Sequence, residues 1–548
     1  MKSAYIIGFA AAVLLASAAP SSGTESTVAP APTTNRSDTV PLYTNLGSHH
    51  KRISTRVPAT QQYFDQGLRL VYGFNHAEAI RSFTRAAELD PTCAMCYWGI
   101  ALAYGPHVNA PMTSASGIAA YEATQKALAL KSHATSPERA YIEAVAQRYE
   151  AVPPTDRARL DTLYSRAMER VANTYANDLD AATLYAESLM DLRPWNYWQP
   201  DGTPYPGTKE IVRQLERVLL GNPNHPGACH YYIHAVEAVN PQAAVSCAER
   251  LAQLMPGEGH MVHMPAHIYI RVGRWNDAVQ ANQHAIHTDE VFIEGQRPMG
   301  VYPLAYYPHN IHFLAFAYTM AGCSAQAIEA SNTLASKVNL DAARQVGLLQ
   351  EMLPYPVLTL TTFGKWDDVL AEPLPPEDIR FSSAMAYYAR GVAHAAKGHR
   401  AEAQAALDMV TAINAATPED ADNKTALSIA VHALSGEIAT RRGDLDAGTS
   451  HFREAAKIED AGLYFEPPKW YYPIRHSLGA VLLKAGQNAE AEKVYREDLR
   501  RFPENGWSLF GLAQALRAQG KNTEAAAAEA RFRRAWASAD VTLTASRF

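Results

Sequence analysis

The stretch YFDQGLRLVYGFNHAEAIRSFTRAAELDP, residues 63–91, decides the fold of this 548-residue chain. Aromatic, small and apolar residues recur in it at helical spacing and form two amphipathic segments separated by a turn. Neither segment can bury its apolar face alone, so we expect the two to pair as a helix hairpin. The residues that set the spacing are Tyr63, Gly67, Leu70, Ala79, Phe83, Ala86 and Pro91.

The same frame recurs as a turn glycine followed five residues later by a small residue. Glycine tolerates the left-handed backbone that ends the first helix, and the small residue lets the second helix pack closely. Successive small residues lie 34 to 49 positions apart. The pairs are Gly273/Ala278, Gly322/Ala327, Gly398/Ala403, Gly443/Gly448, Gly486/Ala491 and Gly520/Ala525, with Gly364/Val369 as a weaker member.

These spacings resemble the tetratricopeptide repeat (TPR), a helix–turn–helix unit of about 34 residues. The resemblance implies an all-α fold, a TPR-like α-solenoid in which helix hairpins form a right-handed superhelix with aromatic-rich insertions. The chain is similar to secreted bacterial TPR proteins with His-bearing helices, marked by runs such as HYYIHAVEA and HMPAHIY. The resemblance implies no particular reaction.

The start of the chain is organised like an export signal. Lys2 precedes an apolar run over residues 4–15, and Ala16-Ser17-Ala18 is a small-residue cleavage site. We expect a signal peptide over 1–18, a flexible leader over 19–45 and a periplasmic or secreted protein. N-terminal and central repeats are expected over 46–370 and C-terminal repeats over 371–548. No second apolar run predicts a transmembrane segment in the mature chain.

The composition narrows the class of protein. There are 49 Lys and Arg against 55 Asp and Glu, a net charge of −6, which does not favour nucleic acid as a partner. Apolar residues make up 47%, enough for a large core, and five cysteines are too few for a disulfide framework. The sequence also lacks GxSxG, phosphate-loop and HExxH motifs.

Histidines concentrate in the middle of the chain, where 10 of the 20 lie between His225 and His312. In the repeat frame, seven of them occupy positions 2, 5 and 9 of first helices in three consecutive repeats. These positions form one stripe, which in the TPR family lines the concave groove. The seven are His230, His234, His260, His263, His267, His309 and His312, and Glu237 joins the same wall.

Two HxxxH pairs in matching register predict a metal site. Imidazole ligands favour copper, with iron or zinc as alternatives, over magnesium or calcium. The predicted ligands are His230, His234, His263, His267, His309 and His312. His260 and Glu237 are predicted to handle protons. The corresponding function is a metal-dependent oxidoreductase acting on a small aromatic or apolar organic molecule, with hydrolysis the weaker alternative.

A scaffold without catalysis stays open as the alternative. In that interpretation the groove binds a peptide or protein partner, and the aromatic insertions only pack the helices. An open groove would favour the scaffold, whereas a covered groove would favour the enzyme. The insertions are centred on Trp195–Trp198, Tyr302–Tyr307 and Trp470–Tyr472.

The cysteines leave two pairings open. Cys93 and Cys96 could be a disulfide, a redox pair or two thiols. Cys229 and Cys247 fall on facing positions of one hairpin and could also form a disulfide. Cys323 would then be left over.

Overall fold

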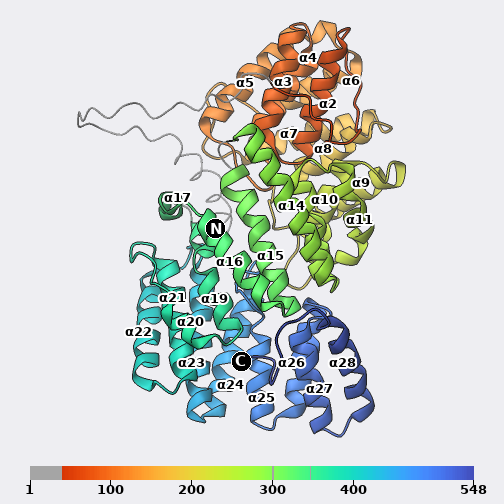
Figure 1. The fold of residues 1–548 in the computed structure, drawn as a ribbon. Coiled ribbons are helices and arrows are strands. Elements are labelled where there is room, and N and C mark those ends of the chain that lie inside the picture. Colours follow the sequence, from red (N-terminus) through yellow and green to blue (C-terminus); the bar gives the residue numbers. More distant parts are fainter. Residues whose placement is uncertain (1–39, 299–301, 346) are drawn as a thin grey trace, which may run out of the picture. The chain divides into compact units, whose positions relative to one another are not determined.

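The computed structural model describes residues 40–298, 302–345 and 347–548 (Figure 1). This part of the chain forms helices, turns and two isolated bridges, with no strand, so the predicted all-α fold is confirmed for it. The predicted signal peptide and residues 19–39 of the predicted leader lie outside the described residues. None of the described helices is both long and apolar enough to cross a bilayer.

The chain divides into two compact units. The N-terminal unit lies within Phe9–Ile268 and His284–Pro303, and the C-terminal unit lies within Tyr269–Gln283 and Leu304–Phe548. The division falls inside α13 (Pro265–Arg271), α14 (Trp275–Gln296) and the π-helix η3 (Tyr302–Tyr306).

Helix hairpins stack in chain order in the N-terminal unit (Figure 1). In addition, α10 contacts both α2 and α8, which joins segments far apart in the sequence. The elements are α2 (Pro58–Tyr72), α3 (His76–Leu89), α4 (Ala94–Tyr104), α5 (Ser114–Ala129), η1 (Lys131–His133), α6 (Ser136–Val145), α7 (Ala158–Thr174), α8 (Leu179–Met190), α9 (Thr208–Gly221), α10 (Pro226–Val236), η2 (Pro241–Ala244), α11 (Val245–Leu254) and α12 (Gly259–His263).

The C-terminal unit repeats this pairing, and its ends meet. Helix α15 contacts α27, where Trp507 Nε1 donates to the Thr319 carbonyl at 3.1 Å. The elements are α15 (Tyr307–Ala321), α16 (Ser324–Lys337), α17 (Leu340–Gln345), α18 (Gly347–Met352), α19 (Tyr355–Thr362), α20 (Trp366–Ala371), α21 (Arg380–Ala396), α22 (Arg400–Ala416), α23 (Lys424–Arg442), α24 (Leu445–Ala461), α25 (Arg475–Lys484), α26 (Asn488–Arg501), α27 (Gly506–Ala518) and α28 (Asn522–Ala535).

The turns have the backbone that the sequence predicts. All seven turn glycines have positive φ, between 66° and 89°. The small partners are buried, as for Ala278 and Ala327 at 0% exposure, so the second helix of each hairpin packs closely. In the 63–91 hairpin the position equivalent to the turn glycine, five residues before Ala79, holds Phe74, and its φ is also positive at 58°.

Candidate metal centre

Helix α10 presents two of the predicted ligands inside the N-terminal unit. His230 and His234 lie one turn apart on it and are 0% and 3% exposed. Gly227 allows the end of α2 to approach this helix, since a Cβ at position 227 would lie 2.4 Å from the Tyr72 ring. The two imidazoles therefore face the interior rather than solvent.

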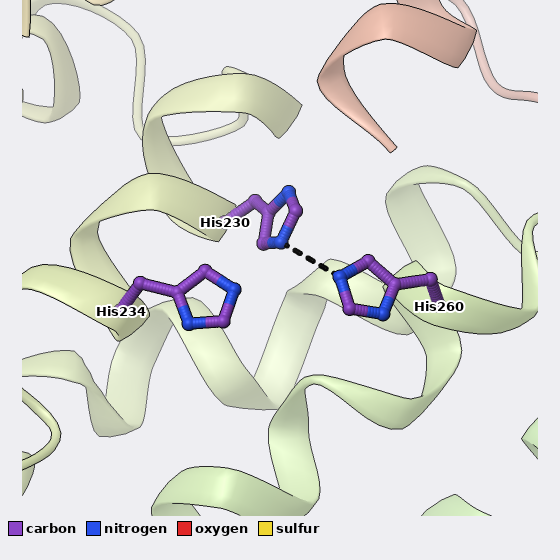
Figure 2. Close-up of side chains that lie close together, drawn as sticks. All are labelled: His230, His234 and His260. Carbon is purple, nitrogen blue, oxygen red and sulfur yellow. Dashed lines mark hydrogen bonds between the residues drawn. The ribbon is translucent and has the colours of Figure 1, made fainter. Parts of the chain in front are cut away.

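A third imidazole completes a trio. His230, His234 and His260 each offer one ring nitrogen, and these nitrogens lie within 4.8 Å of one another. Figure 2 shows the His230 and His234 rings turned toward His260 on α12, with a Nε2–Nε2 distance of 3.1 Å between His230 and His260. A tetrahedral ion bound at about 2.0–2.1 Å spaces its ligands by about 3.3–3.4 Å. The observed separation is close to that geometry.

Hydrogen bonds fix which ring nitrogens of His230 and His234 keep a lone pair. The His230 Nδ1 lies 2.6 Å from the Tyr72 carbonyl oxygen, which can only accept, so Nδ1 carries the proton and Nε2 keeps its lone pair. The His234 Nδ1 lies 3.2 Å from Glu237 Oε1 and donates to it. Within the described residues, His234 Nε2 has no hydrogen-bond partner.

Glu237 is shared by two imidazoles. Its second oxygen, Oε2, lies 2.8 Å from the Nδ1 of His267, and the side chain is fully buried. Burial alone would raise the pKa of Glu237, but His267 and His234 bring this pKa down to about 2. Glu237 is therefore a carboxylate that orients two rings, the role that outer carboxylates take behind metal-bound histidines.

His263 and His267 extend the group on the side of α12 and α13. Their Nε2 atoms lie 2.9 Å apart. This distance is that of a hydrogen bond, so one of the two Nε2 atoms donates to the other. His234, Glu237 and His267 form a second set of ligand atoms within 4.8 Å of one another. We call His230, His234, Glu237, His260, His263 and His267 the imidazole cluster.

Burial favours the neutral form of all three imidazoles. Burial lowers the pKa of His230 and His260 well below the ordinary value and also lowers the pKa of His234. Neighbouring imidazoles add to this effect for His230 and His260. Because a metal needs the neutral ring, these histidines do not have to release protons at neutral pH.

Two aromatic residues in strained backbone cover the imidazole cluster. Phe74 and Trp195 both have left-handed backbones, with φ of 58° and 62°. The Phe74 ring centroid lies 4.5 Å from His230, and Trp195 meets His234 edge-on at 4.9 Å. A left-handed backbone costs a residue with a side chain about 1–2 kcal/mol. The strain at both positions is thus associated with rings on the cluster.

Sequence reasoning missed the role of Phe74, although a signal was present. The turn position that holds glycine in later repeats holds phenylalanine here. A bulky residue at a position that favours glycine indicates that its side chain is needed there. Sequence reasoning did single out the Trp195–Trp198 insertion. Its anchor is Trp198, whose Nε1 donates to the Ala235 carbonyl on α10 at 2.7 Å.

The remaining predicted ligands, His309 and His312, lie on α15 in the C-terminal unit. The His309 ring is half-buried and meets Phe313 at 5.7 Å. His312 is buried with its ring 4.3 Å from Tyr355, and burial lowers its pKa to about 3.

A second polar group in the N-terminal unit was not predicted. Asp180 on α8 accepts at one oxygen, Oδ1, from three groups: His49 Nε2 at 2.9 Å, His225 Nε2 at 3.3 Å and the Tyr72 hydroxyl at 2.6 Å. Lys51 Nζ lies 3.5 Å from the other oxygen. We call His49, Lys51, Asp180 and His225 the Asp180 cluster.

The Asp180 cluster has three side chains that could bind a metal ion, but His225 is protonated on the nitrogen that faces Asp180. His225 is the N-cap of α10, and its Nδ1 accepts from the Ala228 amide at 3.1 Å. Because burial lowers the pKa of His225, the ring is neutral and its proton sits on Nε2, facing Asp180. The ammonium of Lys51 adds a positive charge. These features make the group a buried ion-pair network.

Of the two possible cysteine pairs, one is a disulfide and the other is not. Cys93 and Cys96 form a disulfide at the start of α4. Cys229 on α10 and Cys247 on α11 are reduced and buried, and their sulfurs interact. They face each other across one hairpin, as the repeat frame predicts.

Comparison with known proteins finds only remote structural similarity. No family model matches the chain, and no curated protein matches it. Solved structures similar to the chain include the human IFIT1 dimer with m7Gppp-AAAA, at 12% identity over 88% of this chain and 90% of that chain, with a TM-score of 0.31. They also include the P58(IPK) TPR domain, at 11% identity over 85% and 99%, with a TM-score of 0.21.

Proposed function

We propose that the N-terminal unit is a transition-metal-binding module, with His230, His234 and His260 as ligands. The observation that carries the proposal is the arrangement of the Nδ1 atoms. His230 and His234 direct Nδ1 to fixed acceptors, so their Nε2 lone pairs are left for the centre of the trio. Neutral nitrogen ligands suit copper, and they also suit iron or zinc.

Metal binding would change the proton on the third ligand. In the metal-free protein, His260 Nε2 donates to His230 Nε2, since the latter is an acceptor. For an ion to bind there, His260 would have to adopt the tautomer that carries its proton on Nδ1, which leaves the Nε2 lone pair for the ion. Glu237 supplies one buried negative charge that offsets part of the charge of the ion.

The test is elemental analysis of the protein after purification without affinity tags or chelators. We expect about one equivalent of a single transition metal, retained after dialysis and lost with chelator. Reloading the apoprotein with copper, zinc and ferrous iron in separate titrations identifies the preferred ion. Tight binding of none of the three would refute the proposal.

Oxidative catalysis remains a proposal that builds on metal binding. It requires a fourth coordination position open to substrate, and Trp195 beside His234 is the residue that would have to move. Dioxygen consumption by copper-loaded protein with small phenols tests it. Retention of metal without turnover would leave a binding role.

A partner-binding scaffold is the second candidate, and the fold supports it more directly than it supports catalysis. Stacked helix hairpins offer extended surfaces, and fold alone does not give a reaction. The export predicted from residues 1–18 is part of both proposals. Pull-down with and without bound metal separates them, because only a scaffold retains partners after metal removal.

A further inference from the structure

The C-terminal unit holds an extended segment of its own chain against its helices. Residues 540–548 follow α28 and contain no helix. Leu543, Ser546 and Arg547 within this segment are 6%, 0% and 7% exposed. A non-helical segment rarely buries a serine and an arginine unless specific partners receive them.

Arg547 is buried against the aromatic insertion around Trp470. Its Nη2 donates to the Tyr471 hydroxyl at 3.2 Å, and its guanidinium carbon lies 4.2 Å from the centroid of the Tyr472 ring. Nη1 points to the Thr362 carbonyl at 3.4 Å. A planar guanidinium can stack on a ring and donate hydrogen bonds in its plane at the same time, whereas the ammonium of lysine cannot.

The neighbouring residues Ser546 and Phe548 also make specific contacts. The Ser546 hydroxyl donates to the His476 carbonyl at 2.8 Å and lies 2.6 Å from the Tyr495 hydroxyl. The Phe548 ring meets Trp507 edge-on, with centroids 5.9 Å apart. Ser546 thus contacts a carbonyl and a hydroxyl, Arg547 a tyrosine ring and a tyrosine hydroxyl, and Phe548 the ring of Trp507.

The start of the segment is fixed at a helix end. Asp540 accepts from the amides of Ser324 and Ala325 at 2.7 and 2.9 Å, at the first turn of α16. A carboxylate is favoured there by the unpaired amides and the helix dipole. The segment therefore spans from α16 to the surface formed by α19, α25, α26 and α27.

We propose that this surface is a peptide-docking site, specific for an extended segment with consecutive serine, arginine and aromatic residues, which the chain fills with its own residues 540–548. The proposal is independent of the metal site. Residues 540–548 are the occupant seen in the structure. An exogenous peptide of the same chemistry binds only when the chain's own segment is released.

The test uses the full chain and a labelled synthetic peptide, DVTLTASRF. In the unmodified chain the tethered segment competes at an effective concentration on the order of millimolar, so about 10 μM peptide should not bind. A full-chain variant with Ser546→Ala, Arg547→Ala and Phe548→Ala should bind it at least about tenfold more tightly. The control peptide DVTLTAAAA should bind neither chain.

Two results would overturn the proposal. A folded triple variant that binds DVTLTASRF no better than DVTLTAAAA would make the segment simple packing. Should the triple variant unfold, hydrogen exchange of the unmodified chain decides. A docked segment opens locally, so amides 540–548 should exchange at least about tenfold faster than those of α25–α27. Exchange of all these amides at one common rate would make the segment part of the core.

Discussion

The imidazole cluster and the Asp180 cluster are built from similar side chains and have opposite chemistry. Both lie in the N-terminal unit, and both contain a histidine of α10 or its N-cap and a contact with Tyr72. In the first, His230 and His234 donate outward through Nδ1 and leave their Nε2 lone pairs at the centre. In the second, His225 accepts at Nδ1 and places its Nε2 proton on Asp180. The hydrogen bond at Nδ1 decides whether a histidine can bind metal.

Tyr72 shows the difference within one residue. Its carbonyl oxygen serves the imidazole cluster, and its hydroxyl serves Asp180. The carbonyl is present whatever the side chain, whereas the hydroxyl can be removed. The two clusters can therefore be altered separately by substitution.

The largest expected effect is on metal content. His234→Ala removes the residue shared by the His230–His234–His260 set and the His234–Glu237–His267 set, and it should weaken metal binding by more than about a hundredfold, or about 2.7 kcal/mol. The matched control is His225→Ala at the N-cap of the same helix, which should lower stability and leave the metal stoichiometry near that of the unmodified protein. Metal titration by calorimetry measures both. Equal loss of metal in the two variants would break the comparison.

The next effect concerns stability without metal. Asp180→Asn keeps the shape but removes the charge that three donors and Lys51 share. We expect the free energy of unfolding to fall by about 3 kcal/mol, as for a buried ion pair that loses one partner. Urea denaturation of the apoprotein measures it. Metal affinity should not change, and a parallel loss of metal would show that the clusters act as one.

A smaller effect on metal affinity is expected from Glu237, which hydrogen-bonds two histidines of the imidazole cluster. Glu237→Gln keeps the size of the side chain but removes the carboxylate that orients His234 and His267, which should weaken metal binding about 10–100-fold. Glu169→Gln on the exposed side of α7 is the control and should change nothing. An unaltered affinity in Glu237→Gln would place Glu237 outside the metal centre.

Tyr72→Phe separates the two functions of this residue. Loss of the hydroxyl removes one donor to Asp180 and should cost about 1.5 kcal/mol of stability. The carbonyl that holds His230 remains, so metal affinity should be unchanged within about twofold. Thermal unfolding and metal titration of the same preparation measure the two quantities. A large drop in metal affinity would mean that the ring itself holds α2 against α10.

The smallest expected effect is on pH dependence. Burial lowers the pKa of His230, His234 and His260, so proton competition with the metal begins below the ordinary value of about 6.5. Affinity should stay nearly constant from about pH 7.5 to 6.5 and fall only at lower pH. A metal site of surface histidines with ordinary pKa values would already bind metal more weakly at pH 6.5 than at pH 7.5, because protons compete for the rings. That earlier loss, seen in titrations at several pH values, would point to an exposed site.

Several features of the fold could be predicted because they depend on local sequence. The spacing of the turn glycines reflects the period of a helix hairpin, and all seven have the predicted positive φ. The i, i+4 spacing likewise places His230 and His234 on one face of one helix, whatever the rest of the chain does. Such regularities are visible in a window of about 34 residues.

The partners of these histidines could not be predicted. His230 meets the Tyr72 carbonyl across 158 positions, and His49 meets Asp180 across 131. No periodicity relates such residues, and a backbone carbonyl carries no sequence signal at all. Phe74 was predictable only as an exception, a large residue at a glycine position.

By itself, the sequence determined the helix hairpins, their turns and the enrichment in histidine, because periodic patterns dictate which face of a helix is buried. Only the tertiary structure decided which histidines present an unprotonated nitrogen to the other rings of the cluster. That property depends on the acceptor or donor that each Nδ1 meets, and those atoms come from helices brought together by packing. The physical reason is that hydrophobic periodicity acts within one hairpin, whereas tautomers are set by single hydrogen bonds between hairpins.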